Sequence, residues 1–464
     1  MFKKEVYISR REKLISLVSD GIILLTGNTD VSFNYPANIY TFRQDSSFLY
    51  FFGIKEPNII GIIDANSGEE YMFGNDVEID DIIWMGKLPT MKDFGRKNGV
   101  KNTATLSKAS EFIKKAISQG RKIHFLPTYR AETKLQIQKL LNIPAKEINN
   151  NVSEKLIKAI VKLREKKDKY EIADIEGSID IAYKMHTTAM KMAHAGMTEQ
   201  EIFGTMEGIA LSGGGPVSFP IILSVNGNIL HNHHHHNTLK NGQLLLADAG
   251  AESSMHYCSD ITRVSPVDGK FSSKQKDIYE AVLNANTEVI KNSKAGIPYK
   301  EMHLLSAKII AERLKSVGLM KGNVDDAVAN GAHALFYPHG LGHMMGLDVH
   351  DMEGFGEDNI GYNDNFKRSE QFGLAFLRMA RKLEEGFVMT VEPGIYFIPE
   401  LIDIWKGEKK HTEFINYDKL EEYHDFGGIR LEDDILITKD SCRVLGKPIP
   451  KTVKEVEEMV NSGK

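Results

Sequence analysis

Apolar residues recur in short runs along the first part of the chain. Two such runs, at residues 21–25 and 59–64, have the length of buried strands, and they alternate with helical stretches such as residues 108–119. Strands that alternate with helices indicate an α/β arrangement. The polar, turn-prone triplet at 149–151 ends this region. We therefore predict a smaller N-terminal α/β domain over residues 1–150.

The hydrophobic pattern changes from residue 151 onward. A charged amphipathic stretch over residues 152–182 predicts one or two helices, and helices and strands then alternate to the end of the chain. The expected helices cover residues 176–194, 199–211, 272–292 and 300–316, and the expected strands cover 221–225, 243–249, 260–264, 388–398 and 428–438. The chain, at 464 residues, exceeds the usual size of one hydrophobic core. Residues 151–464 are therefore predicted to form a larger α+β domain, whose two groups of helices suggest an internal duplication.

Composition narrows the class of protein. Apolar residues make up 42% of the chain and charged residues 26%, with a net charge of −5, which is typical of a soluble globular protein. Lysines and arginines are scattered, and the densest basic run, at residues 164–169, is interrupted by acids, so no nucleic-acid partner is expected. Cys258 and Cys442 are too few for a disulfide framework or a sulfur-rich zinc site.

The N-terminus and the apolar runs bear on location. Charged residues follow Met1 where a secreted protein has an apolar core. The longest apolar stretches fall far short of the roughly 18 residues that span a bilayer. We therefore expect a cytoplasmic protein without a membrane partner.

Four acidic residues lie in strand contexts. Asp248 follows an apolar run and Asp260 opens the next strand, so a hairpin brings the two together. Glu392 and Glu432 interrupt apolar strand runs further along the chain. Each of these acids alone is typical of a surface or salt-bridged position. Because an acid in a buried strand requires a partner, the four together favour a functional site.

A glycine-rich segment between the two pairs of acids presents His339, His343 and His350 at intervals of four and seven. Its glycines permit close backbone approach, and imidazoles bind metals and carry protons. Four ionised carboxylates in one cleft repel one another unless cations lie between them. We therefore predict two divalent metal ions. An oxygen-rich site with one imidazole favours Mn²⁺, with Co²⁺, Fe²⁺ or Zn²⁺ as alternatives.

Four segments resemble the signature of the pita-bread metallopeptidases, the group that contains methionine aminopeptidase, aminopeptidase P and prolidase. They are the hairpin with Asp248 and Asp260, the histidine segment at 339–350, and the segments around Glu392 and Glu432. The resemblance runs from about residue 170 to the C-terminus and implies a pita-bread catalytic domain over residues 151–464. It makes Asp248 a ligand of one metal ion and Asp260 and Glu432 bridges between both ions. His343 and Glu392 become ligands of the other ion.

The same resemblance extends to residues around the metal ligands. His231, His339 and His350 match family histidines that position the substrate and stabilise the transition state. We also expect Glu392 to carry a proton from the attacking water to the departing nitrogen. Arginines of the family near the same cleft are matched by Arg378 and Arg430.

The N-terminal region narrows the resemblance. Residues 41–53, followed by Glu56 and Pro57, look like the N-terminal domain of aminopeptidase P and prolidase, which methionine aminopeptidases lack. Trp84 resembles a tryptophan that reaches toward a neighbouring subunit in aminopeptidase P, although a tryptophan is more often packed in a core. The likeness implies a homodimer or a higher homo-oligomer.

The resemblance implies an Xaa-Pro aminopeptidase, which hydrolyses the bond between an N-terminal residue and a following proline in peptides. The alternative is a prolidase that is restricted to Xaa-Pro dipeptides. A catalytically silent peptide-binding module is a third hypothesis, disfavoured because all five ligand positions are retained.

Two departures from the family pattern stand out. Twelve positions separate Asp248 from Asp260, where the family more often has eleven, so the turn at residues 253–257 is expected to hold a bulge or a longer loop. The run His233–His236 after His231 is expected to form an exposed turn that binds metal only adventitiously.

Overall fold

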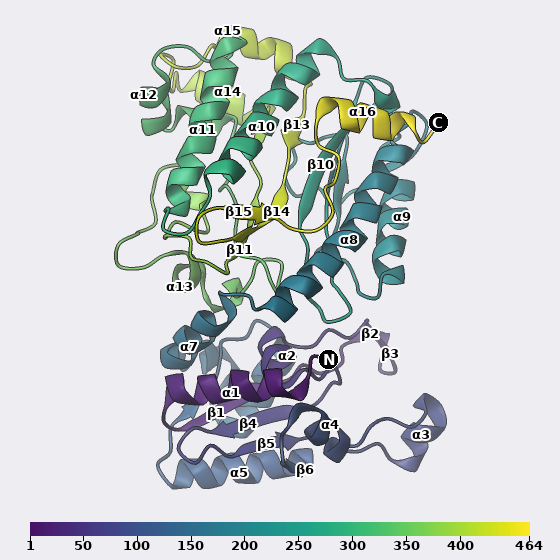
Figure 1. The fold of residues 1–464 in the computed structure, drawn as a ribbon, viewed down its shortest axis with the longest axis vertical. Helices are drawn as coiled ribbons and strands as arrows, with labels where there is room; N and C mark the ends of the chain where they lie inside the picture. The colour runs from purple at the N-terminus through teal and green to yellow at the C-terminus, as the bar shows by residue number, and fades with distance from the viewer. The chain divides into compact units, whose positions relative to one another are not determined.

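The computed structural model describes all residues from 1 to 464 and combines helices with small sheets, which confirms the predicted α+β class (Figure 1). The chain divides into two compact units. The first contains Met1–Arg164 with Glu353–Asn359, and the second contains Glu165–Met352 with Ile360–Lys464. None of the helices combines the length and the apolar character needed to cross a lipid bilayer.

The first unit is built on a sheet with the strand order β6-β5-β4-β1-β7. Its strands are β1 (Ile22–Thr26), β4 (Ile60–Asp64), β5 (Glu70–Phe73), β6 (Asn102–Ala104) and β7 (Ile123–His124), and a separate hairpin contains β2 (Ser32–Tyr35) and β3 (Asn38–Ile39). The runs predicted at 21–25 and 59–64 are β1 and β4, which pair antiparallel. Every residue of β4 is buried, as expected of a continuous apolar run.

Helices cover this sheet and extend from it. They are α1 (Lys4–Val18), α2 (Ser46–Phe52), α3 (Ile79–Met85), α4 (Met91–Asn98), α5 (Leu106–Ser118), α6 (Ala131–Leu141) and α7 (Glu154–Arg164). One face of α5 packs Ala109 and Ile113 into the core of the unit. No residue of α3 is buried, and Trp84 on it is 86% exposed. This exposure excludes the alternative in which Trp84 packs into a core.

The second unit places two pairs of long helices on either side of its strands (Figure 1). One pair is α8 (Lys169–Met192) with α9 (Glu199–Ser212), and the other is α10 (Ser273–Asn292) with α11 (Tyr299–Ser316). Shorter helices are α12 (Val324–Ala329), α13 (Glu357–Gly361), α14 (Pro399–Gly407), α15 (Tyr417–Leu420) and α16 (Val453–Asn461). The two groups of helices expected from the sequence are therefore present, while the internal duplication stays a prediction.

The strands of the second unit form three small sheets. Their orders are β10-β9-β8, β11-β14-β15 and β12-β13. The strands are β8 (Ile222–Ser224), β9 (Leu244–Ala249), β10 (Ile261–Pro266), β11 (Val388–Val391), β12 (Gly394–Tyr396), β13 (Gly428–Arg430), β14 (Asp433–Ile437) and β15 (Cys442–Val444).

Two predicted strands are each divided in the structure. The run at 388–398 breaks at Glu392 and Pro393 into β11 and β12, and the run at 428–438 breaks at Leu431 and Glu432 into β13 and β14. Prediction of one continuous strand was therefore wrong in both places. Pro393 has no N–H to donate to a ladder, which accounts for the first break. Both glutamates consequently lie between strands.

Candidate metal centre and active-site cavity

The first pair of acids is held by an antiparallel hairpin. Thr262 on β10 lies opposite Asp248 on β9, and Asp260 immediately precedes β10. The connecting turn closes with a hydrogen bond of 2.8 Å from Ser253 N–H to the Tyr257 carbonyl. The two strands therefore stay in register from Asp248 and Thr262 out to Glu252 and Cys258, and the turn at residues 253–257 lies beyond them.

The histidine segment is fastened to β11 beside the second pair of acids. His343 N–H donates 3.0 Å to the Thr390 hydroxyl, and Thr390 N–H donates 3.0 Å to the His343 carbonyl. A side chain at Gly342 would collide with the Thr390 carbonyl oxygen. The glycine is thus required by the close approach of two backbones, and this approach places His343 next to Glu392.

Ligand-type atoms from all these segments converge. One oxygen or nitrogen from each of Asp260, His343 and Glu432 lies within 4.8 Å of the others. Nε2 of His343 is 3.4 Å from Asp260 Oδ2 and 3.6 Å from Glu392 Oε1. These separations allow a cation to contact several of these atoms at once, since metal–ligand bonds are roughly 2.0–2.6 Å long.

The electrostatics of the cluster fit a divalent cation. Burial, followed by the negative charge of neighbouring acids, raises the pKa of Asp260 and of Glu432 well above the ordinary value. Burial also raises the pKa of Glu392 to about 7. Buried oxygens on Asp248 and Asp260 have no hydrogen-bond partner. Carboxylates that are buried, crowded and partly unbonded require positive charge nearby, which a metal ion supplies.

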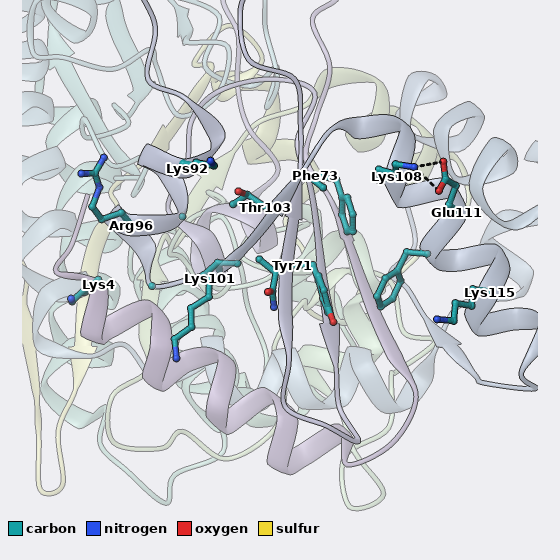
Figure 2. A pocket seen from close by; sticks show the side chains of 16 residues that line it. Lys4, Tyr71, Phe73, Lys92, Arg96, Lys101, Thr103, Lys108, Glu111 and Lys115 are labelled. Carbon is teal, nitrogen blue, oxygen red and sulfur yellow. Dashed lines mark hydrogen bonds and ion pairs between the residues drawn. The ribbon is translucent and has the colours of Figure 1, made fainter.

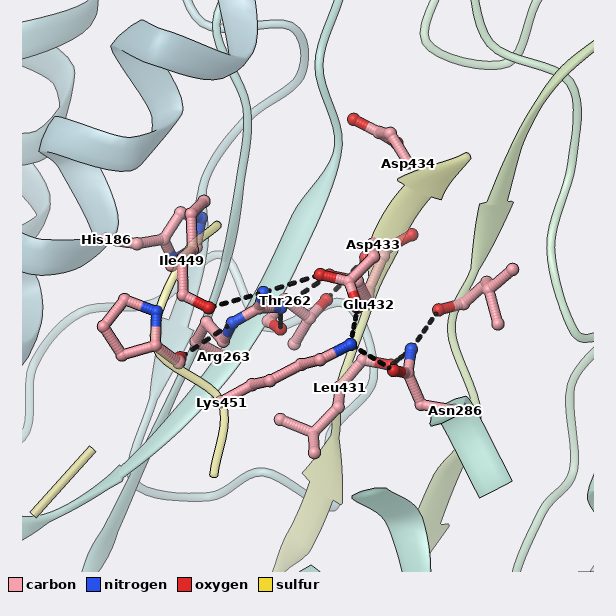
Figure 3. A network of polar contacts seen from close by, with 12 residues as sticks. His186, Thr262, Arg263, Asn286, Leu431, Glu432, Asp433, Asp434, Ile449 and Lys451 are labelled. Atoms are coloured by element: carbon pink, nitrogen blue, oxygen red, sulfur yellow. Dashed lines mark hydrogen bonds and ion pairs between the residues drawn. The ribbon is translucent and has the colours of Figure 1, made fainter. Parts of the chain in front are cut away.

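A network of buried polar contacts holds Glu432 and the neighbouring Asp433 in place (Figure 3). The Thr262 hydroxyl donates 2.6 Å to Glu432 Oε2. Arg263 donates 2.6 Å to the Glu432 carbonyl and makes a 2.6 Å ion pair with Asp433. Lys451 lies 2.6 Å from the other oxygen of Asp433. Although burial opposes ionisation, these two cations hold the pKa of Asp433 well below its ordinary value. Asp433, at the start of β14, therefore serves as an anionic anchor for the adjacent segment that carries Glu432.

Asp434 extends the network to the first pair of acids. Asp260 N–H donates 3.0 Å to its carboxylate. The two residues are 174 positions apart, so the contact links β14 to the start of β10. Asp434 is fully buried, and burial raises its pKa well above the ordinary value.

Arg430 connects the metal centre to a histidine of the cavity. Its guanidinium pairs with Asp248 and donates 2.8 Å to the Tyr396 hydroxyl. That hydroxyl lies 2.9 Å from Nε2 of His339, and Nδ1 of His339 lies 2.8 Å from the Gly340 carbonyl. A carbonyl only accepts, so the ring proton lies on Nδ1 and Nε2 accepts from Tyr396. Burial lowers the pKa of His339 to about 3, which keeps this ring neutral.

His350 packs against His343, one of the candidate ligands. Its ring centroid is 4.2 Å from that of His343, and Arg378 donates 3.0 Å to its Nδ1. Burial lowers the pKa of His350 to about 2. Because Nδ1 accepts a hydrogen bond, the neutral ring carries its proton on Nε2 and can donate it to a bound group.

All ten residues singled out from the sequence line one cavity of about 640 Å³. They are His231, Asp248, Asp260, His339, His343, His350, Arg378, Glu392, Arg430 and Glu432. The structure therefore brings every one of them together, while their individual roles stay predictions. His231 is exposed and lies at the rim.

The prediction for the histidine run that follows His231 was partly wrong. His235 is buried, its Nδ1 donates a hydrogen bond of 3.0 Å to the Leu223 carbonyl, and its ring stacks on Phe203 with ring centroids 4.3 Å apart. A carbonyl requires a donor, so Nδ1 of His235 carries the proton. The aromatic partner and the carbonyl together draw this one histidine inward, while His233 lines the cavity and is exposed.

Sequence reasoning missed the apolar wall of the cavity and two polar residues. The wall contains Phe219, Leu230, Phe372, Phe376, Ile398 and Leu401. The missed polar residues are Tyr396, which contacts His339, and Asn286 on α10, which donates to the carbonyl of Val391 next to Glu392. Asn286 is an amide on the buried face of an amphipathic helix, and that anomaly in the pattern is a signal that could have identified it.

Comparison with known proteins adds to this geometry. The sequence model of the metallopeptidase family M24 matches residues 173–439, and that of the aminopeptidase P N-terminal domain matches residues 7–124. An Xaa-Pro dipeptidase of Homo sapiens is 32% identical over 463 residues, which cover 97% of this chain and 90% of that protein. A probable Xaa-Pro aminopeptidase of Sordaria macrospora is 29% identical over 449 residues, which cover 95% of this chain and 92% of that protein.

Solved structures show the same likeness over the whole chain. Aminopeptidase P from Escherichia coli with the inhibitor Pro-Leu has a TM-score of 0.81 and 26% sequence identity, and the match covers 100% of this chain and 99% of that chain. The aminopeptidase PepP of Pseudomonas aeruginosa has the same TM-score and identity. The predicted pita-bread fold with an additional N-terminal domain is thereby confirmed.

Proposed function

Because the chain belongs to metallopeptidase family M24, in its aminopeptidase P and prolidase branch, we propose that it hydrolyses the bond between an N-terminal residue and a following proline. One observation carries this proposal. Four carboxylates and an imidazole from separate strands and loops converge in a single cavity, beside two further histidines whose burial keeps them neutral. Such a set suits metal-assisted hydrolysis of a peptide bond.

We assign two divalent ions to the acidic cluster. Asp260 and Glu432 would hold both ions, Asp248 would complete one site, and His343 with Glu392 would complete the other. The oxygen-rich donors support Mn²⁺ as first choice, with Co²⁺, Fe²⁺ or Zn²⁺ as alternatives. When bound, such ions lower the pKa of a coordinated water from about 15.7 toward 7 and so supply a nucleophile at neutral pH.

The residues around the cluster have separate tasks in this proposal. Glu392 takes up the proton that the attacking water loses and releases it toward the departing proline nitrogen. His350 donates from Nε2 to the oxygen that becomes negative in the transition state. His339, held by Tyr396 and Gly340, and the rim residue His231 orient the substrate. Arg378 holds His350, and Arg430 holds Asp248.

Proline specificity has a physical basis. A prolyl nitrogen carries no hydrogen, so a site that requires an N–H donor rejects it, whereas a site that offers a ring-sized wall does not. The cavity supplies rings and apolar side chains, of which Phe372 and Phe376 lie in one loop and Ile398 and Leu401 in or beside α14. These surfaces contact an apolar substrate without demanding a hydrogen bond.

The proposed Xaa-Pro aminopeptidase and the alternative prolidase differ in the length of the peptide that they cleave. Relatives include both an Xaa-Pro dipeptidase and a probable Xaa-Pro aminopeptidase. We expect the Mn²⁺-loaded enzyme to cleave an Xaa-Pro-Yaa tripeptide at least as fast as the Xaa-Pro dipeptide, measured as kcat/KM. A strong preference for the dipeptide would overturn the aminopeptidase and establish the prolidase alternative.

A catalytically silent module is tested by metal analysis. Protein prepared without chelator should contain two ions per chain, and an Asp260→Asn variant should contain fewer. Protein that holds no stoichiometric metal and does not cleave either peptide would support a silent peptide-binding role.

The remaining assignments complete the proposal. The predicted region 1–150 is an aminopeptidase P-type N-terminal domain, and residues 151–464 form the catalytic domain. A homodimer or higher homo-oligomer is supported by the exposure of Trp84 and its apolar neighbours Ile83 and Met85 on α3. A cytoplasmic location stays a prediction.

A further inference from the structure

A basic hollow of about 1080 Å³ lies on the first unit and contains none of the residues assigned to the metal centre (Figure 2). Its walls come from the start of α1, from α4, from β5 and β6, and from α5. The charged side chains that line it are Lys4, Lys92, Arg96, Lys101, Lys108 and Lys115 as cations and Glu111 as the one anion. A protein with a net charge of −5 thus concentrates positive charge at one place.

Most of this positive charge is not neutralised within the protein. Lys108 makes a 2.9 Å ion pair with Glu111, and Arg96 pairs with Asp93 outside the lining. The other four cations make no ion pair and are exposed: Lys4, Lys92, Lys101 and Lys115. A concave surface with one sign of charge concentrates ligands of the opposite sign.

An open sheet edge runs through the hollow. β6 is the end strand of its sheet and pairs only with β5. Gly74 N–H donates 3.0 Å to the Ala104 carbonyl, so the backbone of Ala104 is directed toward β5. Backbone groups of successive strand residues point to opposite sides, and the N–H and carbonyl of Thr103 therefore face away from β5. A further strand could pair with them.

The cations flank this edge on both sides. Figure 2 shows Thr103 and Lys101 between Lys92 and Arg96 of α4 and Lys108 and Lys115 of α5. Side chains of an added strand would alternate between these two flanks, because successive residues of a strand point to opposite faces. Acidic side chains on such a strand would meet a cation on either flank.

Apolar surface lies within reach of the same strand. The rings of Tyr71 on β5 and Phe112 on α5 have centroids 4.8 Å apart, and both residues are half-buried in the wall of the hollow. They offer a contact for an apolar side chain placed between acidic ones.

We propose that the hollow binds a short, extended acidic peptide segment that pairs with β6 and directs its carboxylates at the flanking lysines. Addition of a strand to a sheet edge is a recurrent mode of peptide recognition. An elongated array of separate lysines along a strand suits a series of carboxylates better than a single compact phosphate, for which bidentate arginines or a nest of backbone N–H groups are more suitable. Lysines on an edge also hinder pairing with a second copy of the same edge, which favours a partner of opposite charge.

The test uses the full chain and fluorescence anisotropy of a labelled peptide in which Glu alternates with Val. We expect saturable binding at low ionic strength that is lost near 1 M salt, where the screening length falls to about 3 Å. A Lys-Val peptide should not bind. The Glu-Val peptide with a methyl group on every backbone nitrogen should bind at least about tenfold more weakly, since neither of its edges can donate an N–H to β6.

A matched pair of double variants locates the site. K92E/K115E reverses one lining lysine on α4 and one on α5, and we expect it to weaken binding by about tenfold or more. K97E/K114E changes the net charge equally on the same two helices at exposed residues that do not line the hollow, and we expect binding close to that of the unmodified protein. Circular dichroism and thermal unfolding establish that both variants are folded.

Several results would overturn the proposal. Absence of peptide binding would leave the lysines only with the role of preventing two copies of the β6 edge from pairing. An equal loss of peptide affinity in both double variants would indicate a general charge effect. Equal binding of the N-methylated peptide would exclude strand pairing. Binding of tripolyphosphate that is lost in K92E/K115E, without binding of the peptide, would assign the hollow to a phosphate ligand.

Discussion

The side-chain amide of Asn286 donates a hydrogen bond of 3.0 Å to the backbone carbonyl of Val391, the residue that precedes Glu392. The same amide lies 3.5 Å from the carbonyl of Leu431, which precedes Glu432. Its oxygen accepts from Lys451 at 2.9 Å, and Lys451 also pairs with Asp433 (Figure 3). One buried residue on α10 thus ties together the two chain segments that present the glutamates of the cavity.

Replacement of Asn286 by Ala should loosen both glutamates. We expect Mn²⁺ affinity, measured by isothermal titration calorimetry, to fall about 10–100-fold, as is common when groups that orient metal ligands are lost. The free energy of unfolding without metal should fall by about 1–3 kcal/mol, because buried carbonyls and Lys451 lose a partner. Asn292→Ala on the same helix is the control, since the Asn292 amide is exposed and bonds only to the Glu288 carbonyl. Unchanged metal affinity in Asn286→Ala would contradict the orienting role.

Replacement of Asp260 by Asn should have opposite effects on activity and stability. Peptide cleavage and metal content should fall, because a ligand assigned to both ions is lost. In the presence of chelator the variant should be more stable than the unmodified protein by on the order of 1–3 kcal/mol, since one of several crowded buried charges is removed. Chemical denaturation with chelator measures this difference, with Asp180→Asn at an exposed position of α8 as the control. Lower stability of Asp260→Asn under these conditions would show that crowding of the acids is not costly.

Stability of the chelated protein should decrease as pH rises. In the folded state the pKa of Glu392 is about 7, and those of Asp260 and Glu432 are also raised. Between the ordinary carboxyl range near 4 and about pH 7 the folded state therefore binds more protons than the unfolded state, so unfolding becomes easier with rising pH.

Metal should reverse this trend, because ions bind the ionised carboxylates. We expect the gain in Tm on adding Mn²⁺ to grow from about pH 5 to about pH 8, and the affinity for Mn²⁺ to fall below pH 7 as Glu392 takes up its proton. Differential scanning fluorimetry across this range, with and without chelator, measures both. A gain in Tm that does not depend on pH would argue against the raised pKa of Glu392.

Removal of the Tyr396 hydroxyl should separate metal binding from catalysis. This hydroxyl bonds to Arg430 and to His339, and neither residue is an assigned metal ligand. Tyr396→Phe should keep its metal content but lose about tenfold in kcat/KM, the equivalent of one hydrogen bond that orients His339. Tyr417→Phe is the control, because Tyr417 is also buried and its hydroxyl donates to the Lys410 carbonyl, outside the cavity. Loss of metal from Tyr396→Phe would indicate that the hydroxyl supports the ligands and not the histidine.

Local sequence was enough to single out the candidate site residues, all of which line one cavity. An apolar run that ends in an acid marks Asp248 whatever surrounds it, because strand alternation and burial act over only a few residues. The glycine-rich segment around His343 is likewise a local signal that can be recognised without knowing the rest of the fold. The sequence marked Glu392 and Glu432 as acids within apolar runs, but the division of each run into two strands was not predicted, because apolar residues resume after each glutamate; Pro393 was a local sign of the first division.

Tertiary structure alone decided which of these elements meet. Arg430 and Asp248 are 182 positions apart and Asn286 and Val391 are 105 apart, and no local pattern relates them. The lysines of the basic hollow are scattered along the sequence, yet the packing of α4, β6 and α5 brings them together around one sheet edge. The hydrophobic pattern determines the type of each element and its buried face, whereas the pairing of distant elements depends on packing energies summed over the whole core. For that reason the candidate residues of the cavity could be predicted from the sequence, while their supporting network, the apolar wall and the basic hollow could not.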